Sequence, residues 1–431
     1  ISLEGTVGPI GKDFSKATIP LDIRAQLLDE MQVSLTGQVM DPASNLRYDI
    51  SLDIPAFSPR GLIKSLGQPF PVETTDPEAL DRLGIKGKVK GSPTEVSFTE
   101  GILDLDESRM HFSLEAKEFS RPNLAFDMNL DKINLDRYLP PPGEEEAPKG
   151  KPAPKGEKKK TDYAPLRSMV VDGRIRIGEL TAKGANVRDL EMKVTAGDGL
   201  FRMDPLNLKM YEGTVAGKGA FDVRRDVPKT DLDVKAKQIQ VNPLLNDVLK
   251  KDFLEGSFEA DISMSMAGDD AELIKKSLSG KGNLLFTDGA IRGINLTDMV
   301  QNVKSAFRLE RAEKQESRTD FSELRIPFTA ADGIVKTPNS RILTPLLRLT
   351  AMGTANLVEE SLNFRIEPKV VGTLKGKGDE ITRKGVMVPI KVSGTFSSPT
   401  FRPDVEGAAK EKIKEVISDP DKIRELIKGK E

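Results

Sequence analysis

The feature that most constrains this chain is a two-residue alternation of apolar and polar side chains, which recurs along most of its length. It is clearest in five segments, residues 46–54, 110–116, 124–133, 230–236 and 258–266. Successive residues of a β-strand point to opposite faces of the sheet, so each segment would have one apolar and one polar face. The alternation therefore predicts a mainly β protein, built as an extensive antiparallel sheet with a continuous apolar side.

The composition favours sheets with one solvated face over several dense cores. Hydrophobic residues make up 37% of the 431 residues, charged residues make up 31%, and tryptophan is absent. The usual apolar share is about 45–50% when glycine is counted, and the 36 glycines, which have no side chain to bury, fill part of the difference. The net charge of −2 offers no basic field to attract nucleic acid. The lack of cysteine excludes disulfides and thiol chemistry.

The ends of the chain carry two expectations. The chain has no run of about 18 apolar residues, so we expect no membrane-spanning helix within it. It begins with isoleucine inside a strand-like segment, and we therefore expect it to be a portion of a longer protein.

One boundary is evident along the chain. Residues 140–161 are rich in proline, glycine, lysine and glutamate, and they are predicted to form a flexible linker or loop. We expect β-rich regions on both sides of it, at residues 1–139 and 162–405. Residues 406–431 are predicted to form short amphipathic helices.

Few other helices are expected. Asp269 and Asp270 suit the N-terminus of a helix over residues 271–278, and residues 296–307 place apolar side chains at helical spacing. Three alternating strands also pass into short leucine-containing helical turns, over residues 50–66, 128–139 and 234–249.

The sequence contains few candidate catalytic groups. His111 is the only histidine, and it shares its strand face with Ser113 and Glu115, so we interpret it as an exposed strand residue. One histidine without cysteine cannot assemble an ordinary zinc site. The glycine-rich stretches 84–91, 213–222 and 372–378 complete no phosphate-binding motif, and we interpret them as turns, bulges and close backbone contacts. We therefore expect no enzyme, no metal and no cofactor.

The apolar register is the remaining candidate for a working surface. Periodicity leaves two interpretations open: a core sealed by a second sheet, or a trough that holds an apolar ligand. If it is a trough, the candidate lipid-contacting residues are Tyr48, Ile50, Leu52, Phe112, Leu114, Phe126, Met128, Leu130, Ile262 and Met264. Methionine suits a surface that must accept varied shapes.

Four sequence blocks occur in order between residues 280 and 404, and they resemble the C-terminal region of the AsmA family of Gram-negative envelope proteins. The last block is the most characteristic, with Val388, Pro389 and Ile390 followed by the pair Gly394 and Thr395. Upstream, the sequences LDKINLDRYLPPP and PLNLKMYEGTVAGKGAFDV are also similar to segments of this family. The resemblance covers roughly residues 120–405.

This resemblance implies a long, curved antiparallel β-sheet that forms an elongated apolar groove, with a few short helices. It also implies a non-enzymatic envelope-biogenesis protein that binds phospholipid or other acyl chains and helps move lipid from the inner to the outer membrane. The protein would be periplasmic and held at the inner membrane by an N-terminal anchor that this chain lacks, with an outer-membrane or periplasmic protein as a further partner.

Two alternatives remain open at this point. In the first, the protein is a periplasmic scaffold or assembly factor for outer-membrane proteins, and its apolar face is the core of a sealed β-sandwich. In the second, it is a hydrolase of envelope polymers, whose base would have to be His111 or a carboxylate that the sequence does not single out.

Overall fold

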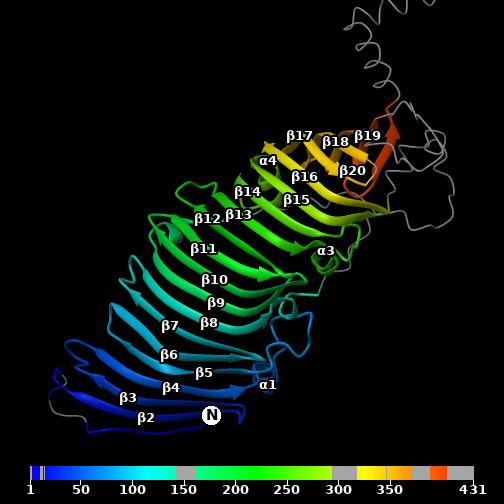
Figure 1. The fold of residues 1–431 in the computed structure, drawn as a ribbon. Helices are drawn as coiled ribbons and strands as arrows, with labels where there is room; N and C mark the ends of the chain where they lie inside the picture. Colours follow the sequence, from blue (N-terminus) through cyan, green and yellow to red (C-terminus); the bar gives the residue numbers. More distant parts are fainter. Residues whose placement is uncertain are drawn as a thin grey trace, which may run out of the picture. The chain divides into compact units, whose positions relative to one another are not determined.

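The computed structural model describes residues 2–9, 13, 15–141, 161–293, 318–345, 347–370 and 389–404 (Figure 1). The described residues are mainly β, with 21 strands and a few short helices. They belong to two compact units, Ile1–Thr230 (unit 1) and Asp231–Glu431 (unit 2). The helices predicted over 296–307 and 406–431, and most of the linker predicted at 140–161, lie outside the described residues.

Unit 1 is a sheet with short helical elements at the ends of its strands. Its strands are β1 (Ser2–Val7), β2 (Thr18–Leu27), β3 (Met31–Met40), β4 (Arg47–Phe57), β5 (Leu83–Gly91), β6 (Glu95–Leu105), β7 (Ser108–Lys117), β8 (Asn123–Asn134), β9 (Val170–Ala182), β10 (Ala185–Gly197), β11 (Leu200–Met210) and β12 (Gly213–Asp222). Its helical elements are α1 (Pro59–Ser65), η1 (Leu135–Arg137) and α2 (Ala164–Arg167).

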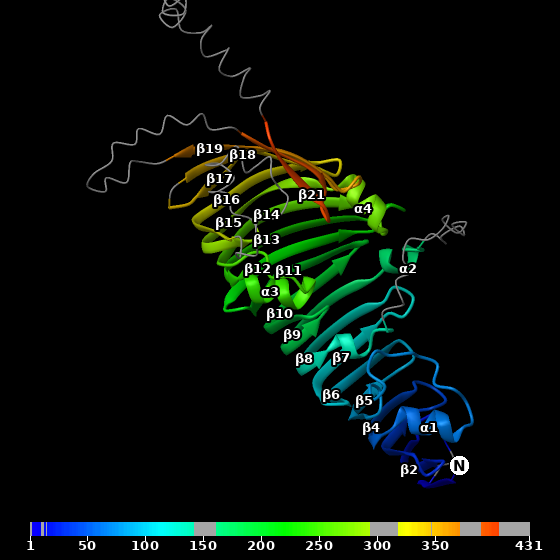
Figure 2. The ribbon, with the colours of Figure 1, turned by 90° about the vertical axis from the view of Figure 1, so that its right-hand side faces the viewer.

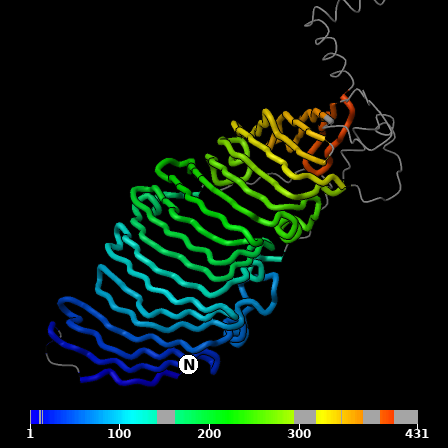
Figure 3. Tube along the Cα trace, in the orientation of Figure 1, coloured from blue at the N-terminus to red at the C-terminus, as the bar shows by residue number. Residues whose placement is uncertain are grey.

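Each strand of unit 1 pairs with the next strand along the chain, and Figure 3 shows these strands side by side in sequence order. All of these pairings are antiparallel except that of β8 with β9, which is parallel. This is a departure from the wholly antiparallel sheet that the alternation predicts. Parallel neighbours need a long crossover connection, and residues 135–169 provide it. The sheet therefore continues from the strands before residue 140 into the strands after residue 161.

Local sequence explains the strand ends. The β10–β11 hairpin turns at Asp198 and Gly199, which both have positive φ, as a tight Asp-Gly hairpin turn requires. The strand exits predicted at residues 50–66 and 128–139 are confirmed as α1 and η1. β4 and β8 run in the same direction, since four antiparallel steps separate them, so α1 and η1 lie at the same edge of the sheet.

Unit 2 contains β13 (Lys229–Gln240), which begins at the unit boundary, and eight strands that pair antiparallel in chain order. These are β14 (Ser257–Ala267), β15 (Ser279–Arg292), β16 (Arg318–Ala331), β17 (Ile334–Leu343), β18 (Leu347–Asn356), β19 (Ser361–Val370), β20 (Ile390–Thr395) and β21 (Pro399–Pro403). Its helices are α3 (Val241–Leu249), which is the third predicted strand exit, and α4 (Ala271–Ser277). As predicted, Asp270 caps α4, accepting the backbone N–H groups of Glu272 and Leu273 at 2.9 Å.

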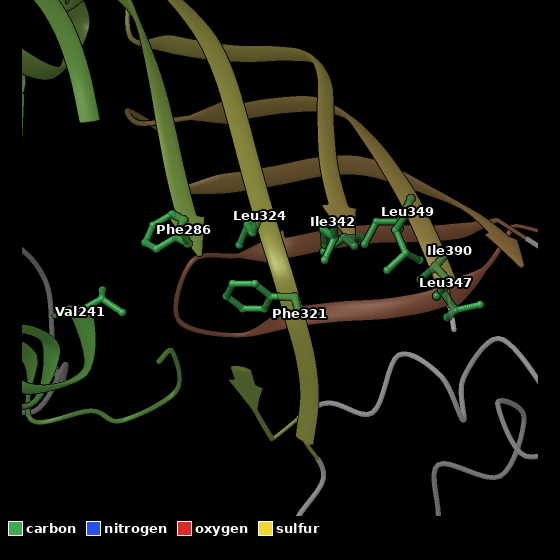
Figure 4. Packing of buried hydrophobic residues seen from close by; sticks show 10 residues of the cluster. Val241, Phe286, Phe321, Leu324, Ile342, Leu347, Leu349 and Ile390 are labelled. Carbon is green, nitrogen blue, oxygen red and sulfur yellow. The ribbon is translucent and has the colours of Figure 1, made fainter. Parts of the chain in front are cut away.

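A closed hydrophobic core lies in unit 2 (Figure 4). Leu347 and Leu349 of β18 are at most 1% exposed. The same cluster takes Val241 from α3 and Ile390 and Val392 from β20. Figures 2 and 4 show the β20–β21 hairpin running across the direction of β16 to β18. In unit 2, therefore, α3 and this hairpin cover part of the apolar face of the sheet.

Candidate functional site

The apolar side chains of unit 1 form rows that cross the strands. We define the central row as the series of paired residues Val7, Leu21, Gly37, Ile50, Val89, Phe98, Leu114, Phe126, Gly173, Val194, Met203 and Gly219. It takes one residue from each strand from β1 to β12, and every member is apolar or glycine. A polar side chain does not interrupt it.

Three further rows run parallel to the central row, at steps of two residues along each strand. In β4 these rows contain Tyr48, Leu52 and Ile54. The row of Leu52 continues after the β5–β6 bulge as Gly101, Phe112, Met128, Ile175, Met192, Leu206 and Gly217. Residues two apart on a strand share a face, so the four rows together make one surface, which we call the apolar face of unit 1.

Eight of the ten sequence-predicted residues lie together on this apolar face. All eight are half-buried, since each is neither enclosed as in a core nor fully exposed, and they are Tyr48, Ile50, Leu52, Phe112, Leu114, Phe126, Met128 and Leu130. Ile262 and Met264 lie on β14 in unit 2, opposite Gly282 and Gly280, and are also half-buried. Contact of any of these ten residues with lipid stays a prediction.

The apolar face of unit 1 differs from that of unit 2 in what covers it. Among the described residues of unit 1, no helix or strand forms a second layer over the central row. A contact at its margin is that of Tyr163 beside α2, which packs edge-on against Phe221 with ring centroids 6.0 Å apart. A half-buried aliphatic surface of this kind leaves apolar area in contact with solvent, and such contiguous patches mark binding sites.

The opposite face of the same strands is polar and carries cross-strand ion pairs. Lys90 lies 2.9 Å from Asp49, and Arg176 lies 2.5 Å from Asp127. These pairs are solvent-exposed, so they contribute little stability and chiefly keep this face hydrated. His111 is exposed on the same face, as predicted, and pairs across the strands with Asn129. Among the described residues, no group of His, Asp and Glu is arranged to hold a metal ion.

Sequence reasoning missed the role of glycine on the apolar face. The stretches 84–91 and 213–222 were predicted to include turns between strands. That prediction was wrong, because they lie within β5 and β12. Several of their glycines occupy apolar-row positions, such as Gly87 and Gly219. The signal was present in the sequence, because Gly87 and Gly91 fall on the same two-residue register as Val89. For residues 84–91 the prediction of close backbone contact was correct, because a Cβ on Gly84 would lie 3.1 Å from the backbone nitrogen of Ala56.

At one edge of unit 1, a single carboxylate accepts several hydrogen bonds. The carboxylate of Asp106, in the β6–β7 turn, accepts the N–H groups of Leu80 (2.9 Å), Asp81 (3.0 Å) and Arg82 (3.1 Å). The hydroxyl of Tyr138 donates to the same carboxylate at 2.8 Å. Burial by itself would raise the pKa of Asp106, but these hydrogen bonds together hold that pKa below its usual value.

A second set of contacts fixes the same segment, residues 66–82. Arg137 of η1 pairs with Asp76 at 2.6 Å and also contacts Glu107. A backbone hydrogen bond from Glu78 and the side-chain bond from Arg137 lower the pKa of Asp76. Arg60 of α1 reaches the same segment through the Thr74 hydroxyl at 2.7 Å. The α1–β5 connection is therefore an ordered border along one edge of the sheet.

Comparison with known proteins identifies the family of the chain. The model of the AsmA family matches residues 80–340, which is more than half of the chain. The chain belongs to the AsmA family. The resemblance seen in the sequence is thereby confirmed, although the block at residues 388–404 lies beyond the matched range.

Two proteins of Escherichia coli strain K12 are similar to this AsmA-family chain. Protein AsmA is 21% identical over 336 residues, covering 73% of this chain and 54% of that protein. The AsmA family protein YhjG is 20% identical over 421 residues, covering 92% of this chain and 57% of that protein. The chain thus spans a little over half the length of either relative. No solved structure matches it. None of the helices in the described part of the chain combines the length and apolarity needed to cross a bilayer.

Proposed function

We propose that the apolar face of unit 1 binds the acyl chains of phospholipids or similar lipids, and that the protein takes part in envelope biogenesis without catalysing a reaction. The observation that carries this proposal is the central row, which crosses twelve strands without a polar side chain. Membership of the AsmA family supports the role in the envelope.

The chemistry of the face suits an acyl chain. Each methylene group moved from water to an apolar surface gains about 0.8 kcal/mol, so partial contact with one chain already holds it appreciably. Twelve strands spaced at about 4.8 Å give the central row a length on the order of 50 Å. Its aliphatic members resemble one another, so no single position would trap a chain and a bound lipid would slide along the row.

The polar surroundings complete this proposal. Head groups would stay in water beside the open face, while the ion-paired opposite face, with Lys90 and Asp49, keeps the sheet soluble. The direction of movement would be from inner to outer membrane, in a periplasmic protein anchored to the inner membrane and assisted by an outer-membrane or periplasmic protein partner. Family membership and the half-buried apolar rows support this arrangement.

A second candidate is a scaffold or assembly factor for outer-membrane proteins. The closed core of unit 2, with Leu347 and Leu349 fully buried, favours it, because the covered part of that face has no room for lipid. The two candidates differ in unit 1. A scaffold would bind no acyl chain there, whereas a lipid carrier would.

The experiment that tests the proposed function measures lipid directly. Native mass spectrometry of the purified chain, followed by lipid extraction, should show co-purifying acyl lipid. Titration of lipid-free protein with cis-parinaric acid, an unbranched fluorescent fatty acid, should give saturable binding. Protein that carries no lipid and does not bind this probe would refute the proposal.

A further inference from the structure

The aromatic side chains on the apolar face lean onto glycines of the neighbouring strand. The three atoms nearest to a Cβ built on Gly173 all belong to the ring of Phe126, the residue with which Gly173 pairs. In the same way, a Cβ on Gly101 would lie 2.7 Å from the ring of Phe112, its own partner. Atoms at these separations overlap, so the rings occupy space that only a glycine leaves empty.

The arrangement recurs too often to be an accident of one pair. The rings of Phe98 and Tyr48 cover Gly87 and Gly91 in the same manner, and in unit 2 a Cβ on Gly282 would lie 2.6 Å from the ring of its partner Phe328. Neither Gly173 nor Gly101 has a positive φ, so a turn does not explain their presence. At Gly173, where all three nearest atoms belong to the ring of Phe126, the space that this ring needs explains the glycine.

We infer that these glycine–aromatic pairs determine how far the aromatic rings rise above the strand backbones. They thereby set the space left for a lipid chain on the apolar face and are specificity-determining for that chain. A ring that rests on a glycine adds apolar area without rising into the path of a chain. A methyl group at the glycine would push that ring upward, and the space for an unbranched chain would narrow. This inference rests on the proposed function, since it specifies how the same face admits its ligand.

The test uses Gly173→Ala in the purified chain, with cis-parinaric acid as the probe. A tilted ring would displace about two methylene groups from the apolar face, so we expect about tenfold weaker binding, equivalent to about 1.4 kcal/mol. The matched control is Gly197→Ala, because nothing lies within 4 Å of a Cβ at Gly197 and its φ is not positive. This control should bind the probe as the wild type does.

A rescue variant shows whether weaker binding by Gly173→Ala comes from the displaced ring or from loss of structure. Adding Phe126→Leu to Gly173→Ala removes the displaced ring, and binding should return to within about twofold of the wild type. If circular dichroism shows that Gly173→Ala is unfolded, the same series of variants is made at Gly87 and Phe98. There the ring of Phe98 covers Gly87.

The outcomes distinguish this inference from the proposed function. A wild-type protein that does not bind the probe would refute the proposed function itself. A wild-type protein that binds, with Gly173→Ala equal to Gly197→Ala, would overturn only the inference. Weak binding that Phe126→Leu fails to restore would also overturn it, because the ring would then not be the obstacle.

Discussion

A charge placed on the apolar face distinguishes an open surface from a core. Met128 lies in the row beside the central row, between Phe112 and Ile175, and is half-buried. Complete burial of a methionine side chain stabilises a protein by about 1.5–3 kcal/mol. For Met128→Asp we therefore expect a loss of about 1–1.5 kcal/mol in the free energy of unfolding, and a protein that remains folded.

Lipid binding should be affected far more than folding. The aspartate would remove contact with about three methylene groups at about 0.8 kcal/mol each, which is about 2.4 kcal/mol, or about 50-fold in dissociation constant. The assay pairs urea unfolding with cis-parinaric acid titration. The matched control is Asn129→Asp, which adds the same charge at the next residue, on the exposed polar face.

Two results would refute this reasoning. A loss above about 4 kcal/mol on Met128→Asp would place Met128 in a sealed core, because effects of that size come from buried charge or cavities. Equal loss of probe binding in Met128→Asp and Asn129→Asp would show that the two faces do not differ in function.

The remaining predictions concern stability. Leu349→Ala should cost about 2–5 kcal/mol, since Leu349 is 1% exposed, whereas Leu52→Ala on the half-buried face should cost clearly less; urea unfolding compares them, and equal costs would contradict an open face. Because the folded-state pKa of Asp106 is depressed, its stabilising contribution is present at neutral pH and is lost as the pH falls below about 4. Asp106→Asn should therefore flatten that part of the unfolding profile between pH 7 and pH 3, and an unchanged profile would contradict the assignment. Asp270→Ala should cost about 1 kcal/mol by removing the cap of α4, while Asp269→Ala, outside the cap position, should cost less in the same urea assay.

Much of the strand content was predictable because it depends on local alternation. Of the predicted segments, residues 47–54, 110–116 and 124–133 lie within β4, β7 and β8. The three strand exits and the cap at Asp270 were predictable for the same reason, since a few adjacent residues determine each of them.

Closure of the apolar face was not predictable, because it depends on distant parts of the chain. Leu52 and Leu349 stand in similar alternating segments, yet Leu52 is half-buried and Leu349 is fully buried. The difference arises because α3 and β20, through Val241 and Val392, pack into the same cluster as Leu349. No local pattern around either leucine contains that information.

The pairing of strands across the sheet was likewise not predictable from the sequence. The parallel contact of β8 with β9 depends on where the chain returns after residue 161, and alternation is the same for either direction. The role of Gly173 depends on Phe126, 47 positions away in sequence. Glycine looked like a turn residue because its partner ring becomes visible only once the strands are in register.

The most direct test of the central claim is site-specific photo-crosslinking of the protein in intact cells. A photoreactive phenylalanine analogue would replace Leu52 or Leu114 on the apolar face, and Ser51 or Ser113 on the polar face as matched controls. Mass spectrometry would then identify the adducts. We predict acyl-lipid adducts at Leu52 and Leu114 and few or none at the two serines. Absence of lipid adducts at both leucines, or equal labelling of the two faces, would contradict the account.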